Sequence, residues 1–284
     1  MSYKKILCIL CFFSLNAVAQ NPISDFEISD TVCLGETLRI INNSLNAEEY
    51  QWDFCTGDLT LVPNGKKILT SDYLSNPLNI KIYKSNNNFY GFSASTTGNG
   101  NIVRLDFGND LSNTPIVKDL GNFNNSLLDP SDVEIVHVNN SWQGIVVSQN
   151  GSVHIVDFGS SLKNQPTIQK LAISLTDQPR GISFINDNNS LGFVVSYFGS
   201  GKLTTICFGN SLFNVPSLIN YSVPNGQRTS GIDLFKDGSI WYGIATDYGA
   251  DNIYLLEYQN DICIAPSVSM INFSGRIDLP VGAF

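Results

Sequence analysis

Charged side chains and histidines are scarce in this chain, and basic residues are the rarer charged class. Only 14% of its 284 residues are charged, with 16 lysines and arginines against 25 aspartates and glutamates, so the formal net charge is −9. A chain without a basic field does not attract phosphate groups, which excludes nucleic acid and anionic lipid as expected partners. Hydrophobic residues make up 43% of the chain, so it can build a packed core and does not belong to the disordered class.

The sequence also lacks the strong motifs of catalysis and metal binding. It has two histidines, His137 and His154, and neither a His-Glu-x-x-His nor a Gly-x-Ser-x-Gly motif. The segment 199–202 (Gly-Ser-Gly-Lys) resembles part of a phosphate loop, but Ser196 stands where the first glycine is needed, so it predicts a turn. The acidic segment 247–252 lacks the ligand spacing of a twelve-residue calcium loop. We expect packed histidines and polar turns at these positions.

Residues 1–19 have the pattern of a secretory signal peptide. Lys4 and Lys5 precede an apolar run over 6–15, and the small residues at 17–19 (Ala-Val-Ala) form a cleavage site before Gln20. The apolar run is too short for a membrane-spanning helix, which needs about 20 residues. We expect the mature chain to be secreted or held at the outer cell surface, without membrane insertion.

Four of the six cysteines follow this segment, at Cys33, Cys55, Cys207 and Cys263. An even number in an exported chain allows two disulfides, with three connectivities. Cys33 and Cys55 form the favoured pair, because a disulfide that closes a loop of about 20 residues stabilises by about 3 kcal/mol. For Cys207 and Cys263 the sequence does not decide between a disulfide and two buried free thiols. No Cys-x-x-Cys remains after the signal peptide to predict a zinc or thioredoxin-type site.

One segment of the chain occurs four times, over 102–120, 153–171, 203–221 and 253–271. Each copy carries an aromatic residue, here called the aromatic anchor, and a proline further on. The anchors are Phe107, Phe158, Phe208 and Tyr258, and the prolines are Pro115, Pro166, Pro216 and Pro266. Both series have spacings of 51, 50 and 50 residues. Between them an apolar position repeats at Leu111, Leu162, Leu212 and Ile262, and glycine follows the anchor in every copy but the last, which has Gln259.

Each copy belongs to a unit that predicts four short strands. Turn pairs such as Asn-Gly at 150–151 and Asp-Gly at 237–238 separate apolar runs, and the mature chain shows no sustained helical spacing. Four strands in about 50 residues are typical of a β-propeller blade, in which neighbouring sheets bury each other's faces. A β-sandwich gives no reason for the constant period, and solenoid coils are shorter. We predict an all-β propeller over 59–284, with units near 76–123, 129–174, 178–223 and 227–273.

Both ends of the chain hold parts of a further unit. Phe54 lies 53 residues before Phe107, and the segment 275–279 (Gly-Arg-Ile-Asp-Leu) resembles 231–234 (Gly-Ile-Asp-Leu), which opens the fourth unit. A blade shared between the two ends would close a five-bladed ring. The alternative is a fragment or an abbreviated form of a longer protein, and the sequence leaves both open.

The segment 20–58 contains a motif of a different kind. Residues 50–54 read Tyr-Gln-Trp-Asp-Phe, after Cys-Leu-Gly-Glu at 33–36 and Asn-Asn-Ser at 42–44. This pattern resembles the immunoglobulin-like PKD domain, although Cys-Thr-Gly-Asp at 55–58 replaces the Gly-Asp-Gly of that family. With the signal peptide and the asparagine-rich repeats, the chain resembles large secreted surface proteins of Bacteroidetes-type bacteria. The resemblance implies cell-surface interaction rather than catalysis.

A set of polar residues repeats in the innermost strand of each predicted unit. The residue after the first apolar position is Lys81, Glu134, Ser183, Asp233 and, in the partial further unit, Asp278. Because the innermost strands of a propeller surround its central channel, Glu134, Asp233 and Asp278 are candidate ligands of a cation or a polar molecule. The alternative is that they are solvated walls of the channel. No cofactor is expected other than a candidate Ca²⁺ ion.

Many loops and few ionisable groups are typical of recognition. We therefore expect a secreted, non-catalytic binding or adhesion protein, and not an enzyme, whose partner is an extracellular glycan or protein. Two alternatives stay open. A metal-dependent propeller hydrolase or lactonase would hold its metal with carboxylates at the channel. A structural spacer would be part of a larger type IX secreted surface protein.

Overall fold

The computed structural model describes residues 23, 25–28, 39–46, 72–96, 100–187, 190–259 and 262–271, which fall in two compact units, 1–66 and 67–284. In the first unit, β1 (Phe26–Ile28) pairs antiparallel with β2 (Ile40–Asn42). The signal-peptide pattern, the PKD-like motif at 50–58, the pair Cys33 and Cys55, and the segment 275–279 lie outside the described residues. The predictions made for them stay predictions.

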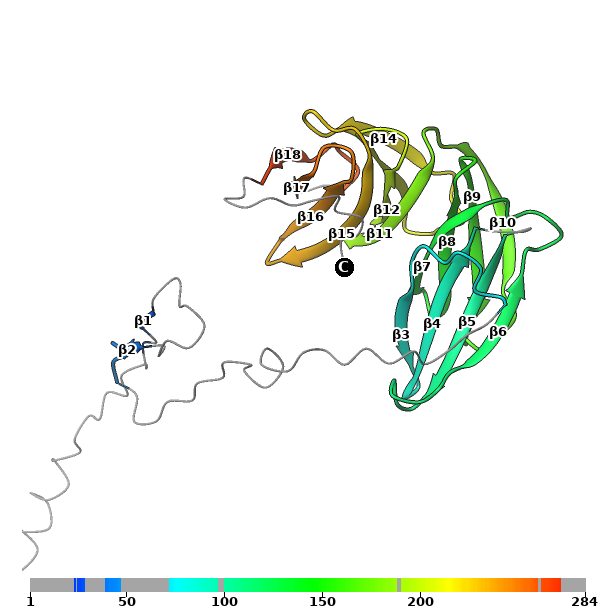
Figure 1. Ribbon diagram of the computed structural model, residues 1–284, viewed down its shortest axis with the longest axis horizontal. Coiled ribbons are helices and arrows are strands. Elements are labelled where there is room, and N and C mark those ends of the chain that lie inside the picture. The colour runs from blue at the N-terminus through cyan, green and yellow to red at the C-terminus, as the bar shows by residue number, and fades with distance from the viewer. Residues whose placement is uncertain are drawn as a thin grey trace, which may run out of the picture. The chain divides into compact units, whose positions relative to one another are not determined.

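The second unit contains four antiparallel sheets, each built from four strands in chain order (Figure 1). The first sheet contains β3 (Lys81–Ser85), β4 (Asn88–Ser95), β5 (Asn101–Gly108) and β6 (Ile116–Gly121). The second contains β7 (Pro130–Val138), β8 (Ser141–Ser148), β9 (Ser152–Gly159) and β10 (Thr167–Ser174). The third contains β11 (Pro179–Asp187), β12 (Ser190–Tyr197), β13 (Lys202–Gly209) and β14 (Ser217–Ser222), and the fourth β15 (Thr229–Asp237), β16 (Ile240–Asp247), β17 (Asn252–Tyr258) and β18 (Ser267–Met270).

The repeated residues have the same structural task in each sheet. All four aromatic anchors are buried on the third strand, and each repeated proline directly precedes the fourth strand. The glycines after the first three anchors have left-handed backbones, with φ of 71° at Gly108, 65° at Gly159 and 69° at Gly209. Glycine adopts this conformation without the steric penalty that a Cβ atom brings. An asparagine six residues after the anchor then closes the turn, as Asn214 Nδ2 does by donating to Phe208 O over 2.9 Å.

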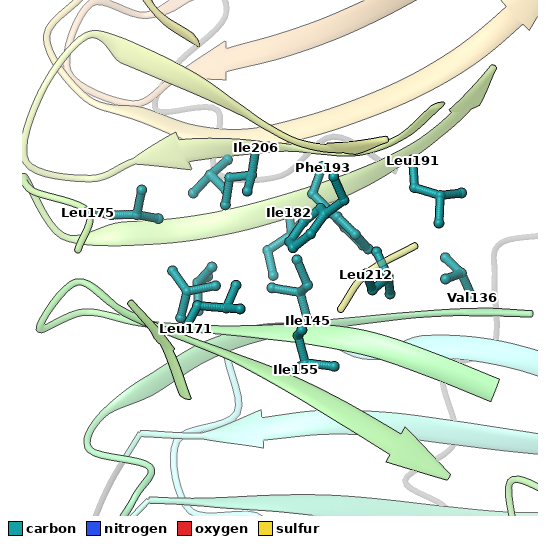
Figure 2. Close-up of a cluster of buried hydrophobic side chains, with 14 of the residues drawn as sticks. Val136, Ile145, Ile155, Leu171, Leu175, Ile182, Leu191, Phe193, Ile206 and Leu212 are labelled. Carbon is teal, nitrogen blue, oxygen red and sulfur yellow. The ribbon is translucent and has the colours of Figure 1, made fainter. Parts of the chain in front are cut away.

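Neighbouring sheets bury their apolar faces against each other. In the cluster between the second and third sheets, Ile145 and Ile155 of the second sheet approach Ile182, Phe193 and Ile206 of the third (Figure 2). Similar clusters join the first sheet to the second and the third to the fourth. A single four-stranded sheet cannot hide both faces from water, so this mutual cover is the main source of hydrophobic stabilisation. The prediction of an all-β fold with four propeller-type blades is confirmed.

A disulfide joins the third and fourth sheets. Cys207 of β13 is bonded to Cys263, which lies between β17 and β18, with a Cα–Cα distance of 5.9 Å. The sequence alone did not decide whether these two cysteines form a disulfide or stay free thiols. Their pairing removes two of the three connectivities, so Cys33 and Cys55 can only pair with each other if a second disulfide forms.

Candidate functional site

The first strands of the four sheets bring the repeated polar residues together in pairs. Lys81 Nζ on β3 donates to Glu134 Oε2 on β7 over 2.5 Å, and Ser183 Oγ on β11 lies 3.4 Å from Asp233 Oδ1 on β15. Lys81 Nζ also donates to Ile182 O on β11 over 2.5 Å. These contacts link three neighbouring first strands through one ammonium group. Lys81, Glu134, Ser183 and Asp233, together with Asp132, are called the channel cluster below.

Asp132 is the centre of the buried half of this cluster. Its Oδ2 atom lies 3.1 Å from Lys81 Nζ and accepts hydrogen bonds from Ile182 N over 2.9 Å and Asn79 Nδ2 over 3.2 Å. Only 2% of its side chain is exposed. Sequence reasoning missed Asp132, although it lies two residues before Glu134 and therefore on the same face of the strand. The alternation rule of strands could have found it.

Tyr83 was missed for the same reason, because it lies two residues after Lys81 on β3. Its hydroxyl donates to Glu134 Oε1 over 3.2 Å and accepts from Ile135 N over 2.9 Å. Asn79, whose side chain donates to Asp132, also lines a hollow of about 270 Å³. The other residues that line this hollow are Leu74, Pro77, Leu78, Ile80 and Ser93.

Burial controls the proton affinities in this half of the cluster. Burial raises the pKa of Glu134, and this effect outweighs the nearby Lys81, which acts in the opposite direction. Burial alone would lower the pKa of Lys81, but Asp132 and Glu134 reverse the effect and raise it. Burial and the charge of Glu134 together raise the pKa of Tyr83 well above its usual value. Glu134 is therefore a carboxyl group that can hold a proton more easily than a solvated one, beside a lysine that stays charged.

Asp233 has a more open environment. It is half-buried on β15, and Ser183 is its hydrogen-bond partner within the described residues. Asp278, the third predicted ligand, lies outside the described residues. The described part of the chain contains no group of three His, Cys, Asp or Glu side chains placed to hold a metal ion. A cation site at these residues stays a prediction.

The other polar residues considered in the sequence lie in packed or hydrogen-bonded positions of the fold. His137 packs on Trp142, with ring centroids 4.7 Å apart, and His154 is buried on β9. The segment 199–202 forms a turn in which Gly199 N donates to Asp177 O over 2.8 Å. The carboxylate of Asp247 accepts hydrogen bonds from backbone amides around it, such as that of Gly249 over 2.9 Å.

Comparison with known proteins gives a likeness in fold only. No family model and no curated protein matches the sequence. The catalytic domain of an α-L-arabinofuranosidase from Coprinopsis cinerea has a TM-score of 0.55 at 11% identity, over 74% of this chain and 72% of that one. An α-L-arabinofuranosidase from Podospora anserina, in complex with cellotriose, has a TM-score of 0.52 at 11% identity, over 67% and 66% of the two chains. For an exo-β-1,3-galactanase from Phanerochaete chrysosporium the TM-score is 0.48 at 11% identity, and the match covers 68% of this chain and about half, 49%, of that one.

The comparison overturns one prediction. We expected a non-catalytic binding or adhesion protein, and not an enzyme, because a loop-rich ring with few ionisable groups suits recognition. That reasoning is wrong, since solved structures that share this β-propeller fold, such as the two α-L-arabinofuranosidases, are glycoside hydrolases. The fold therefore does not favour binding over catalysis.

Within the described residues, no helix is long and apolar enough to span a membrane.

Proposed function

We propose that the chain is a secreted hydrolase of glycosidic bonds, with Glu134 as the proton donor and Asp233 as the second carboxylate. The proposal is carried by the raised pKa of Glu134 and by the second carboxylate, Asp233, on another first strand. Glu134 is packed against Lys81 and Tyr83 with a raised pKa, whereas Asp233 is half-buried beside a serine hydroxyl. Most glycosidases use two carboxyl groups whose surroundings give them different proton affinities. The secretory pattern at 1–19 and the activities named for the fold neighbours support an extracellular glycan as the substrate.

The chemistry of such a site divides between the two carboxyl groups. Protonated Glu134 gives its proton to the glycosidic oxygen as the bond from that oxygen to the anomeric carbon breaks. A water molecule adds to the anomeric carbon, and ionised Asp233 takes the proton that the water loses. Lys81 and Asp132 position Glu134, and Lys81 stabilises the carboxylate that remains after proton transfer.

The test is hydrolysis of arabinose- and galactose-containing polysaccharides by the mature chain, measured as released reducing sugar. We expect Glu134→Gln and Asp233→Asn each to lower the rate by about 100-fold or more, which is the usual contribution of a positioned acid or base. Asp237→Asn removes an exposed carboxylate from the same strand as Asp233 and should leave the rate unchanged. Equal activity in Glu134→Gln and the wild-type chain, with both folded, would rule the proposal out.

The predicted role of Glu134 and Asp233 as cation ligands can be decided in the same assay. If a cation such as Ca²⁺ is part of the site, chelation by EDTA should abolish hydrolysis and added Ca²⁺ should restore it. If the two carboxylates act directly on the substrate, EDTA should change neither the rate nor the thermal unfolding temperature.

A further inference from the structure

Two arginines lie over a single aromatic ring at one end of the third and fourth sheets. Arg180 Cζ is 4.5 Å and Arg228 Cζ is 5.3 Å from the ring centroid of Phe198. The ring of Tyr248 lies 5.6 Å from that of Phe198. Arg180 belongs to β11, Arg228 directly precedes β15, and the two aromatic residues directly follow β12 and β16. These four residues are called the arginine platform below.

Backbone hydrogen bonds hold the platform in place. Phe198 N donates to Gln178 O over 3.0 Å, and Tyr248 N donates to Arg228 O over 2.9 Å. Asp247, which is fully buried, holds the segment before β15 and the segment after β16 together. Its carboxylate accepts from the amides of Gln227 over 2.7 Å and of Arg228, Gly249 and Ala250 over 2.9 Å each. The side chains are therefore presented by a rigid frame before any ligand arrives.

The positive charge of the platform is not neutralised by its surroundings. Among the described residues, neither guanidinium group has a hydrogen bond or an ion pair. Asp247 accepts from backbone amides, and Asp177 is paired with Lys202 at 3.0 Å. Burial lowers the pKa of Arg180, so part of its hydration has already been lost. Arg180 is half-buried and Arg228 is exposed, so the two guanidinium groups lie side by side over one ring, within reach of an anion from solvent.

The repeat itself does not require these side chains. Gln149 N donates to Asp129 O over 2.9 Å, which is the bond that Phe198 and Tyr248 make in the next two sheets. The second sheet thus has Gln149 where the third and fourth have an aromatic residue, and it has Asp129 where they have Gln178 and Arg228. Packing of the blades is compatible with uncharged or acidic residues there, so the platform is an addition to the fold.

We propose that the arginine platform binds the carboxylate of an acidic sugar residue, a uronic acid, in a glycan. A planar guanidinium group donates two parallel hydrogen bonds to a carboxylate, and the adjoining aromatic rings offer an apolar surface to the C–H groups of a sugar ring. The inference rests on the proposed function for the saccharide nature of the ligand, and it adds the substrate class.

The platform and the channel cluster share β11, and Arg228 directly precedes β15, which carries Asp233. Arg180 precedes Ser183 by three residues on β11, which corresponds to about 10 Å along the strand. Arg228 likewise precedes Asp233 by five residues of the chain. A glycan whose acidic residue is bound at the platform can therefore extend toward Asp233.

The test is the affinity of the mature chain for the galacturonic acid trisaccharide, measured by calorimetry, with its methyl ester as the uncharged comparison. We expect the free acid to bind at least tenfold more tightly than the ester, and the difference to shrink as salt is added. Arg180→Gln and Arg228→Gln should each weaken binding of the acid by about tenfold, which is typical for loss of a hydrogen bond to a charged group. Arg228→Lys should recover only part of the affinity, because lysine keeps the charge but not the paired donors.

Lys163→Gln is the matched control, since it removes one positive charge from an exposed site in the turn between β9 and β10. It should leave the affinity unchanged, and thermal unfolding of each variant confirms that it is folded. Equal affinity for acid and ester, or unchanged binding in both arginine variants, would overturn the inference. Tighter binding of a sulfated trisaccharide than of the carboxylate would overturn the assignment to a uronic acid.

The failure of this inference can be told apart from failure of the proposed function. Cleavage of neutral glycans without arginine-dependent binding of the acid would remove the inference alone. Arginine-dependent binding of the acid, with no glycan cleaved and no effect of Glu134→Gln, would remove the hydrolase alone.

Discussion

His154 lies on β9 with 1% of its surface exposed, and neither ring nitrogen has a hydrogen-bond partner among the described residues. Burial lowers its pKa to about 4, and Lys170, opposite it on β10, acts in the same direction. The imidazole is therefore neutral in the folded chain at neutral pH. An unfolded chain has no such restriction and binds a proton to this residue near pH 6.5.

This difference makes stability depend on pH with a definite sign. Above about pH 6.5 His154 is neutral in both states and contributes nothing, whereas between about 6.5 and 4 only the unfolded chain is protonated, so stability falls as the pH is lowered. Urea unfolding at about pH 7 and about pH 5 should show a smaller loss in His154→Leu than in the wild-type chain. His137→Gln, at an exposed position, should show the full loss. The same loss in His154→Leu as in the wild type would contradict the prediction.

At the scale of elements, equivalent leucines of the repeat differ in what covers them. Leu212, in the third sheet, is fully buried in the cluster between the second and third sheets. Leu162, in the second, is fully buried against the first sheet. Leu111, in the first sheet, is 44% exposed. The repeated leucine therefore packs on the blade that precedes its own. Within the described residues, Leu162 and Leu212 have a preceding blade to pack on, and Leu111 does not.

This contrast predicts different costs for one substitution. Leu212→Ala should lower the free energy of unfolding by about 2 to 5 kcal/mol, because it removes buried methyl groups and leaves a cavity. Leu111→Ala, at a partly solvated site, should lower it by about 1 kcal/mol or less. Urea unfolding of both variants measures the difference. Comparable losses in the two would show that Leu111 is covered in solution.

The sequence predicted the elements better than it predicted the site. The aromatic anchors and prolines mark the third and fourth strands because burial and turn geometry act within one unit and repeat with it. Asp132 and Tyr83 lie two residues from Glu134 and Lys81, so the period-two alternation of strands points to both. The bond between Cys207 and Cys263 could not be deduced, since it depends on how two sheets are stacked. The expectation of a non-catalytic protein was wrong because missing motifs do not decide between binding and catalysis, and solved structures with this fold are glycoside hydrolases.

At the scale of the whole second unit, side-chain contacts between neighbouring sheets stabilise their arrangement. The third and fourth sheets are joined by Lys236 Nζ and Asp187 Oδ1 at 2.6 Å, and by the hydroxyl groups of Tyr221 and Tyr258 at 2.6 Å. Burial raises the pKa of Tyr258 to about 12, so both phenols stay neutral and the hydrogen bond persists at any physiological pH. The fourth sheet carries Asp233, and Tyr248 directly follows its strand β16. These contacts between the third and fourth sheets therefore fix the positions of residues from both proposed sites.

The disulfide between Cys207 and Cys263 is the covalent link between the same two sheets, and it should contribute measurably to stability. It closes a loop of 56 residues, for which chain entropy predicts a stabilisation of about 4 kcal/mol. We expect the double variant Cys207→Ser/Cys263→Ser to unfold at a lower urea concentration than the wild-type chain by an amount of this order. If Cys33 and Cys55 form the predicted second disulfide, reductant would cleave that bond as well. The double variant should therefore be compared in the absence of reductant, and any further shift that reductant causes in it reports on the second pair. Identical unfolding midpoints for the double variant and the oxidised wild type would mean that the sheet contacts alone hold the fourth blade, and the proposed sites would then survive reduction intact.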